Sequence, residues 1–319
     1  MTLTVSSLGE RALIARITAR LAIPSWVIVG PGDDAAVIAP VRGELDVLTT
    51  DALVDGVHFD RRFVPPEATG HRALAVNLSD LAAMGAEPRA ALLSFAMPRD
   101  LEVSEVDRML DGMLNLAAAY RVAVIGGNLT GTPGPLTIDV TAIGSVRPRR
   151  VLTRAGARPG DEVFVTGRLG GAAVGLRALK QGADAAGVEQ YLRPQPRVRA
   201  GMILGRTRTA SSCMDLSDGL ADGLRQVAEA SNVGMEVDAA AIPLAEGASL
   251  DDALSGGDDY ELLFTVPPRN RGRFRGARSR FADLPVSRLG VVTKTRDLIL
   301  RDNGDIRPLP QGYEHLRCD

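Results

Sequence analysis

Residues 49–58 read Thr-Thr-Asp-Ala-Leu-Val-Asp-Gly-Val-His, and residues 30–36, just upstream, read Gly-Pro-Gly-Asp-Asp-Ala-Ala. Both stretches place acids beside glycine or threonine in a context that otherwise predicts buried β-strand. Carboxylates packed this closely repel one another, and in a partly dry site they cannot all ionise without a cation nearby. The sequence therefore predicts that a positive group lies between these acids.

The same pattern, an acid or amide next to glycine or a hydroxyl at a strand end or helix start, recurs along the chain. Oxygen donors without a histidine or cysteine cluster favour magnesium or calcium over zinc. Glycines let the backbone approach a phosphate, and amides at helix starts favour anions. We therefore expect a nucleotide bound with several magnesium ions. The six stretches are Gly32-Asp33-Asp34, Thr49-Thr50-Asp51, Asn77-Leu78-Ser79-Asp80, Gly126-Gly127-Asn128, Asp215-Leu216-Ser217-Asp218-Gly219 and Gly256-Gly257-Asp258-Asp259-Tyr260.

Each motif taken singly also has an ordinary structural explanation. Asp-Gly and Asp-Asp pairs are common turn residues, and Asp218 with Gly219 can simply cap a helix. Asp80 differs, because it lies in an apolar helix pattern where an unpaired carboxylate is costly. His58 is a lone histidine that suits packing or hydrogen bonding as well as ligand contact. Arg154 is the candidate phosphate contact among the arginines of 147–154.

Composition excludes several classes of protein. With 319 residues, 45% hydrophobic and 24% charged, the chain has the profile of a soluble globular protein of one or two domains. A net charge of −2 and 4% aromatic residues argue against nucleic acid as a partner. No apolar run is long enough for a membrane span, and the N-terminus lacks signal-peptide features. The two cysteines, Cys213 and Cys318, form no disulfide framework, so we expect a cytoplasmic protein.

Helix and strand patterns alternate along the chain, which predicts an α/β or α+β fold. We expect a first helix from a Ser7–Glu10 capping box to Pro24, and a later one capped by Ser104. A charged, Pro- and Gly-rich stretch predicts domains at 1–147 and 148–319. Further helices are expected at 66–85, 170–180, after Pro196 and at 218–230, and strands at 26–29, 45–51, 90–97, 122–125, 136–146, 162–166, 260–266, 286–293 and 297–301.

The six stretches, in this order and spacing, closely resemble the thiamine-monophosphate kinases, which belong to the aminoimidazole ribonucleotide synthetase-like superfamily. The resemblance runs from Gly9 to His315. It is most specific in the stretches Thr49–Phe59, Val76–Ala86 and Met214–Gly219. It implies an N-terminal domain whose mixed sheet pairs with that of a second subunit in a homodimer, an α/β C-terminal domain, and ATP with several magnesium ions.

The resemblance also implies roles for individual residues. By motif, it implies magnesium ligands at Asp34, Thr49, Thr50, Asp51, Asp80, Asp215 and Asp218, with catalytic roles for Asp51 and Asp218. It implies ATP contacts at Gly127, Asn128, Arg154 and Ser217, and thiamine contacts at His58, Asp258 and Tyr313. Many relatives have Asp where Asn128 stands and Glu where Asp258 stands, and a nucleotide-contacting tyrosine of some relatives has no match here.

The implied reaction is ATP-dependent phosphorylation of thiamine monophosphate to thiamine diphosphate. Its nucleophile is an anionic phosphate oxygen, which needs no general base, and none is obvious in the sequence. Magnesium would relieve the repulsion between the two anions. One alternative is another ATP-dependent synthetase of the superfamily, although selenophosphate synthetases carry a reactive Cys near the N-terminus and this chain has none before Cys213. Another alternative is a non-catalytic nucleotide-binding dimer.

Overall fold

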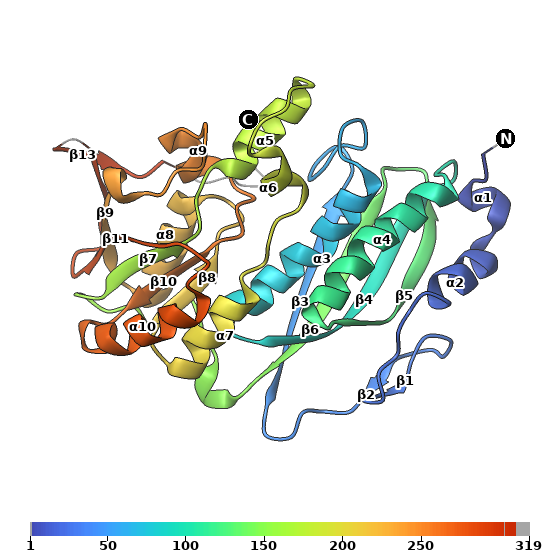
Figure 1. The fold of residues 1–319 in the computed structure, drawn as a ribbon, viewed down its shortest axis with the longest axis horizontal. Helices are drawn as coiled ribbons and strands as arrows, with labels where there is room; N and C mark the ends of the chain where they lie inside the picture. Colours follow the sequence, from blue (N-terminus) through green and yellow to red (C-terminus); the bar gives the residue numbers. More distant parts are fainter. Residues whose placement is uncertain (1, 303, 311–319) are drawn as a thin grey trace. The chain divides into compact units, whose positions relative to one another are not determined.

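The computed structural model describes residues 2–302 and 304–310, drawn as a ribbon in Figure 1. The chain divides into two compact units. The first comprises the residues up to Leu81 together with Glu87–Arg147, and the second comprises Ala82–Ala86 together with the chain from Pro148 onward. Each unit has its own sheet. Among the described residues, no helix has the length and apolar character needed to cross a bilayer.

A four-stranded mixed sheet, in the order β3-β6-β4-β5, forms the centre of the first unit. The strand β6 pairs antiparallel with both neighbours, whereas β4 pairs parallel with the edge strand β5. A short hairpin, β1 with β2, lies outside this sheet. The elements are α1 (Val5–Leu8), α2 (Glu10–Thr18), β1 (Val27–Val29), β2 (Val37–Ile38), β3 (Leu45–Val54), α3 (Pro66–Ala83), β4 (Glu87–Pro98), α4 (Val103–Tyr120), β5 (Ala123–Thr132) and β6 (Thr137–Val146).

Helices α3 and α4 lie side by side against this sheet (Figure 1), and glycines set their closest approach. A Cβ atom on Gly70 of α3 would lie 1.8 Å from the Met109 carbonyl oxygen of α4. A Cβ on Gly112 of α4 would lie 1.9 Å from the Glu67 carbonyl oxygen of α3. The two backbones are therefore in direct contact, which leaves no room for any larger side chain at either position.

The second unit contains a seven-stranded sheet in the order β13-β12-β9-β11-β7-β10-β8. Within the described part of this sheet, β12 and β9 pair in parallel, and every other neighbouring pair is antiparallel. Apolar residues of β7, β10 and α8 form its buried core. The elements are β7 (Glu162–Thr166), α5 (Gly171–Lys180), α6 (Val188–Leu192), α7 (Val198–Thr207), β8 (Ser212–Asp215), α8 (Leu220–Ser231), β9 (Gly234–Asp238), α9 (Leu250–Ser255), β10 (Leu262–Val266), α10 (Arg271–Arg278), β11 (Val286–Thr293), β12 (Leu298–Asp302) and β13 (Asp305–Pro308).

The expected mixture of helices and sheets is confirmed, but two predicted helix starts are wrong. The first capping box joins Thr4 to Ser7 rather than Ser7 to Glu10, and Gly9 at φ 83° then separates α1 from α2. Helix α4 begins after Glu102, and Ser104 lies within its first turn. In both places several polar residues are available as caps, so the sequence pattern alone does not select one.

Three predicted boundaries are also displaced. The strand expected to end before Gly126 continues to Thr132, because β5 pairs in parallel with β4 along its whole length. The strand expected from residue 260 begins at Leu262, and the helix expected from residue 218 begins at Leu220. In the last two cases, the acidic motif itself occupies the loop before the element.

Candidate functional site

Two of the expected magnesium ligands contact each other in the first unit. Thr49 on β3 donates its hydroxyl to the Asp80 carboxylate on α3 at 2.5 Å. This bond supplies the polar partner that a carboxylate in an otherwise apolar helix pattern requires. Asp51 follows two residues along β3, so strand alternation places it on the same face as Thr49. These three oxygen-bearing side chains therefore lie on the side of the sheet that faces α3.

Thr50 lies on the opposite face of β3 from Thr49. Its hydroxyl donates to the Asp139 carboxylate at 2.9 Å and lies 3.1 Å from the Thr141 hydroxyl, both on β6. No motif identified Asp139, although the alternation of 136–146 places it on the other face of its strand from Ile138 and Val140. Register places Ser94 beside both Asp139 and Asn128. The expected ligands on β3 are thus divided between the two faces of the sheet.

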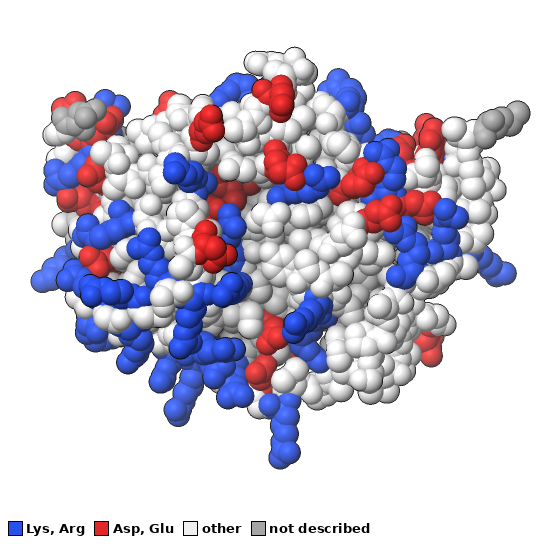
Figure 2. Space-filling view, viewed as in Figure 1, with Lys and Arg blue, Asp and Glu red and all other residues white. Residues whose placement is uncertain are grey.

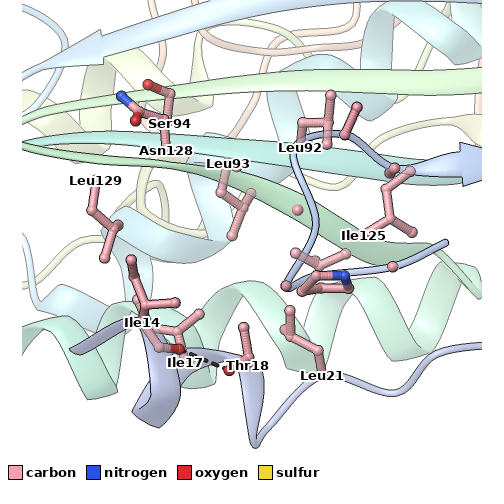
Figure 3. Close-up of a pocket in the computed structure, with 18 of the residues that line it drawn as sticks. Ile14, Ile17, Thr18, Leu21, Leu92, Leu93, Ser94, Ile125, Asn128 and Leu129 are labelled. Atoms are coloured by element: carbon pink, nitrogen blue, oxygen red, sulfur yellow. Dashed lines mark hydrogen bonds between the residues drawn. The ribbon is translucent and has the colours of Figure 1, made fainter. Parts of the chain in front are cut away.

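A cavity of about 860 Å³ lies within the first unit. Figure 3 shows Ile14 and Ile17 on one side of it and Leu93 and Ile125 on the other, with Asn128 toward one end. Its polar lining includes Asp33, Asp34, Asn128, Asp139 and Thr141. An apolar chamber with acids on its lining suits a flat apolar group attached to a group that binds cations.

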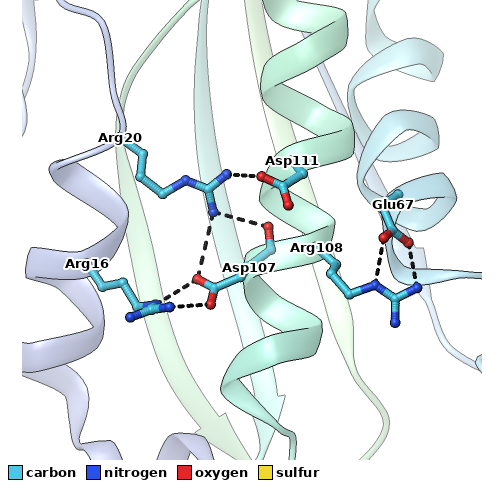
Figure 4. A network of polar contacts seen from close by, with 6 residues as sticks. All are labelled: Arg16, Arg20, Glu67, Asp107, Arg108 and Asp111. Atoms are coloured by element: carbon cyan, nitrogen blue, oxygen red, sulfur yellow. Dashed lines mark hydrogen bonds and ion pairs between the residues drawn. The ribbon is translucent and has the colours of Figure 1, made fainter.

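Ion pairs fix the helix that supplies one wall of this cavity. Arg16 of α2 donates two hydrogen bonds to the Asp107 carboxylate of α4, at 2.7 and 2.6 Å. Arg20, just beyond α2, pairs with Asp107 and with Asp111 (Figure 4). These exposed pairs add little stability one by one, but a bidentate network orients the helix. The side chains Ile14 and Ile17 are thereby held toward the cavity.

One arginine holds the open end of the β1–β2 hairpin, whose loop carries Asp33 and Asp34. The Arg89 guanidinium on β4 lies 4.7 Å from the centre of the Trp26 ring, which precedes β1. The same side chain donates to the Ala39 carbonyl after β2 at 2.9 Å, and Ala39 donates its amide to Trp26. Both Asp33 and Asp34 are exposed. No sequence motif identified Arg89, because its role depends on contacts between distant residues.

Gly127 has a packing requirement that is independent of any ligand. A Cβ atom at this position would lie 1.8 Å from the Leu93 carbonyl oxygen of β4. The glycine is therefore needed for β4 and β5 to pair, and a nucleotide contact is not required to explain it. Asn128, the next residue, is exposed and lines the cavity.

His58 is bound to its own loop. Its ring nitrogen Nδ1 accepts a hydrogen bond from the Val54 amide at 3.1 Å, and its backbone amide donates to the Val54 carbonyl. The neutral ring therefore carries its proton on Nε2. Nε2 is thus the donor nitrogen of the ring.

The sheet of the second unit joins two of the acidic motifs. Strand β8 ends at Asp215 and β10 begins at Leu262, and these two residues are paired in register. The pairing continues into the loops, where Asp258 donates its amide to the Ser217 carbonyl at 2.6 Å. Asp218 and Asp258 are both half-buried. The stretches 215–219 and 256–261, which are distant in sequence, thus form one acidic site.

Two of the expected ligand contacts, Arg154 and Tyr313, are not seen facing a binding site among the described residues. Arg154 donates to Gln226 of α8 at 2.5 Å, so its guanidinium is already engaged. Tyr313 lies outside the described residues. Figure 2 shows basic side chains gathered on one face of the second unit around α10 and α7, elements that carry none of the six motifs.

The expected magnesium ligands do not form a preassembled metal site. Among residues 2–302 and 304–310, no group of three or more His, Cys, Asp and Glu side chains is arranged to hold a metal ion. Two of the expected ligands bond to carboxylates instead: Thr49 to Asp80, and Thr50 to Asp139, which was not among the expected ligands. Other oxygen donors are needed to complete a coordination shell.

Comparison with known proteins defines the class. Residues 32–146 match the family model "AIR synthase related protein, N-terminal domain", and residues 158–303 match "AIR synthase related protein, C-terminal domain". Similar folds include a hydrogenase maturation protein HypE in complex with ATP, with a TM-score of 0.78 at 20% identity, which shows the fold alone. The chain is thus an AIR synthase-related protein of two domains.

Full-length relatives narrow the class to one family. The thiamine-monophosphate kinase of Bacillus subtilis is 34% identical, with 97% of this chain and 100% of the relative covered. That of Escherichia coli K12 is 37% identical, with 97% and 98% covered. The crystal structure of the kinase from Stenotrophomonas maltophilia K279a matches with a TM-score of 0.83 at 36% identity, over 96% of this chain and 99% of that one. The chain belongs to the thiamine-monophosphate kinase family.

Proposed function

We propose that this protein transfers the γ-phosphoryl group of ATP to the phosphate of thiamine monophosphate, giving thiamine diphosphate and ADP. The observation that carries the proposal is the match to a structure described as AaThiL complexed with AMPPCP and TMP. That structure has a TM-score of 0.76 and is 32% identical over 99% of this chain and 100% of its own. In the proposed reaction, an oxygen of the acceptor phosphate bonds to the γ-phosphorus while the bond to ADP breaks, and ADP leaves with the electron pair.

The cavity of the first unit is the proposed nucleotide site. Its apolar walls, Ile14, Ile17 and Ile125 among them, suit the face of an adenine ring. Asn128 and the backbone of Gly127 lie on the same lining, in support of the ATP contacts implied by the motif. Arg154 and Ser217 remain proposed ATP contacts in the second unit, and binding there requires Arg154 to exchange its bond to Gln226 for a phosphate.

Magnesium is the proposed cofactor, and the chemistry of the donor set supports it. The proposed ligands bear carboxylate or hydroxyl oxygens only, and hard oxygen donors favour magnesium. The acids beside the cavity would repel a triphosphate unless cations lie between them. When bound, magnesium neutralises phosphate charge and orients the reacting groups. The proposed ligands are Asp34, Thr49, Thr50, Asp51, Asp80, Asp215 and Asp218, of which Asp51 and Asp218 are the proposed catalytic carboxylates.

The acceptor's thiamine portion is cationic, and the acidic site of the second unit suits it. Asp258 is the proposed partner of the thiazolium ring, with an attraction that strengthens as water is excluded. His58, through its Nε2–H, and Tyr313 complete the proposed substrate contacts. No general base is required, because the attacking phosphate oxygen is already anionic at neutral pH. Positioning and electrostatics then carry the catalysis.

We propose two domains, residues 1–147 and residues 148–319. The first domain is the proposed contact between the two subunits of a homodimer. Leu48 on β3 is 66% exposed and shares the sheet face of Thr50 by alternation. Exposed large apolar residues on a sheet face are typical of a protein–protein interface. Leu48→Asp should convert a dimer to a monomer in light scattering, and a wild-type monomer would contradict the proposed homodimer.

A cytoplasmic location is also proposed, consistent with the free, buried thiol of Cys213.

The test is direct measurement of products with the purified full chain. Thiamine monophosphate, ATP and magnesium should yield thiamine diphosphate and ADP in equal amounts, and no product should form when magnesium is chelated. Turnover with another acceptor, but none with thiamine monophosphate, would favour a different ATP-dependent synthetase of the superfamily. ATP binding by calorimetry without turnover on any acceptor would favour the non-catalytic nucleotide-binding dimer.

A further inference from the structure

The loop 256–261, between α9 and β10, has an unusual backbone. Gly257 adopts φ 68°, and two residues with side chains, Asp258 and Tyr260, adopt φ 59° and φ 50°. The left-handed region disfavours residues that carry a Cβ, tyrosine more than aspartate. Two such residues separated by a single position persist only where surrounding contacts fix them, and such strain is concentrated at functional sites.

Asp259, between the two strained residues, anchors the loop to a helix start. Its carboxylate accepts hydrogen bonds from the Gly170 amide at 2.7 Å and from the Ala172 amide at 3.4 Å. Both amides belong to the start of α5, where unpaired N–H groups and the helix dipole favour a negative charge. The Asp259 side chain therefore points into the protein and is engaged there.

Glu261 anchors the other end of the loop. Its carboxylate accepts two hydrogen bonds from Arg197, at 2.8 and 2.5 Å, and one from the Thr166 hydroxyl at 2.5 Å. Glu261 is 3% exposed, so this buried charge is fully paired. The same Thr166 hydroxyl accepts the Leu262 amide, which ties the start of β10 to β7.

Asp258 is placed between these anchors. Its amide donates to the Ser217 carbonyl, beside the acidic motif 215–219, and the Tyr260 hydroxyl donates to its carboxylate at 3.0 Å. A cavity of about 350 Å³ in the second unit is lined by Asp258, Asp259 and Glu261. Three acids in four residues thus have different partners: Asp259 is bound by the start of α5, Glu261 by Arg197 and Thr166, and Asp258 by Tyr260 beside the motif 215–219.

We propose that Asp259, Tyr260 and Glu261 are positioning residues, which hold the strained loop so that the Asp258 carboxylate is presented to the cationic ring of the acceptor. The inference rests on the proposed function, because it assigns the orientation of a group that the proposal places against thiamine monophosphate. Tyr260 selects one rotamer of Asp258 through its hydroxyl, while Asp259 and Glu261 select the backbone conformation that makes the contact possible.

The experiment compares steady-state kinetics of Asp259→Asn, Tyr260→Phe and Glu261→Gln with wild type. Each variant should raise the KM for thiamine monophosphate about fivefold or more, with the KM for ATP and the kcat at saturating acceptor within about twofold of wild type. Asp259→Asn keeps one acceptor oxygen and should be milder than Asp259→Ala. Asp251→Asn, an exposed acid on α9 before the loop, is the matched control and should behave as wild type.

The outcomes separate the two claims. Wild-type protein without turnover on thiamine monophosphate contradicts the proposed function. If wild type is active and the KM for thiamine monophosphate of Asp259→Asn and Tyr260→Phe is as unchanged as that of Asp251→Asn, the positioning role alone is overturned. If Asp259→Asn or Glu261→Gln fails to fold by circular dichroism, Tyr260→Phe decides, because it removes one hydroxyl and retains the packed ring. A Tyr260→Phe variant in which kcat falls while the acceptor KM is unchanged also overturns the role.

Discussion

The Thr49 hydroxyl donates to the Asp80 carboxylate at 2.5 Å, and this bond joins β3 to α3 in the first unit. It accounts for an acid that the helix pattern alone leaves unexplained. It also brings two hard oxygen donors together on elements packed against each other. A hydroxyl that donates to a carboxylate keeps its own lone pairs available, so the pair can accept a cation without rearrangement of the fold.

Asp80→Asn separates the charge of this pair from its hydrogen bond. The amide oxygen still accepts the Thr49 hydroxyl, so the free energy of unfolding should change by less than about 1 kcal/mol. Loss of the charge should lower turnover about tenfold or more at limiting magnesium. Asp46→Asn, an exposed acid on the same strand, is the control. A variant with normal turnover and a normal magnesium requirement would remove Asp80 from the metal site.

Asp51→Asn and Asp218→Asn test the carboxylates proposed as catalytic in the two units. Each should lower turnover about tenfold or more while the fold persists, because each removes one negative charge from a magnesium site. Activity should be measured across a magnesium titration, with circular dichroism as the check on folding. Wild-type turnover in both variants at limiting magnesium would count against the whole metal assignment.

Local patterns in the sequence predicted the acidic motifs and most of the elements that carry them. The antiparallel pairing of β8 with β10 then explains why stretches 215–219 and 256–261 belong to one site. Pairing of this kind is non-local, and no pattern within either stretch specifies it. The division of Thr49 and Thr50 between the two faces of the sheet, by contrast, follows from the strand period alone.

Residues that act only through distant partners escaped prediction. Asp139 has no glycine or hydroxyl residue directly next to it in the sequence, and its role comes from the hydrogen bond that it accepts from Thr50 on the neighbouring strand. Arg89 stacks on Trp26, a residue more than sixty positions away in sequence. The resemblance implies that Gly127 contacts ATP, and the Leu93 carbonyl supplies an independent reason for a glycine there.

The glycines at the crossing of α3 and α4 provide a test of the fold. Gly70→Ala and Gly112→Ala each place a methyl group inside a backbone carbonyl of the other helix. Each should destabilise the protein by about 3 kcal/mol or more, because backbone must move apart. Gly276→Ala, on exposed α10 with nothing within 4 Å, is the control and should stabilise by about 0.5–1 kcal/mol through helix propensity. Urea denaturation gives the free energy of unfolding of all three variants. Equal changes in the three would contradict the close backbone contact between α3 and α4.

Arg89→Ala tests the anchor of the loop that carries Asp34. Loss of the Trp26 stacking and of the Ala39 hydrogen bond should cost about 1–2 kcal/mol of stability. The KM for magnesium-ATP should also rise, with the KM for thiamine monophosphate unchanged, because the loop 30–36 lines the proposed nucleotide cavity. Arg99→Ala, an exposed arginine beyond the other end of β4, serves as the control. An increase in both KM values would indicate a general loss of structure instead.

The raised pKa of the Asp259 carboxyl should make the free energy of unfolding depend on pH. Loss of hydration raises its pKa from 3.8 to about 7, against the lowering effect of the Gly170 and Ala172 amides. A carboxyl with a raised pKa retains its proton in the folded state between pH 4 and 7, whereas the unfolded chain has released it. The folded state binds more protons in this window, so its contribution to stability falls as pH rises. At about 1.4 kcal/mol per pKa unit, the loss has an upper limit of about 4 kcal/mol.

The variant Asp259→Asn isolates this group, since its amide does not titrate. The free energy of unfolding should be measured by urea denaturation from pH 4.5 to 8 for both proteins. Subtraction cancels the other titrating groups, so the advantage of wild type over the variant should shrink as pH rises and level off above about pH 7. An advantage that stays constant from pH 4.5 to 8 would show that the two amide bonds offset the loss of hydration. Asp259 would then be an ionised anchor throughout this range, with its pKa no higher than the usual value for aspartate.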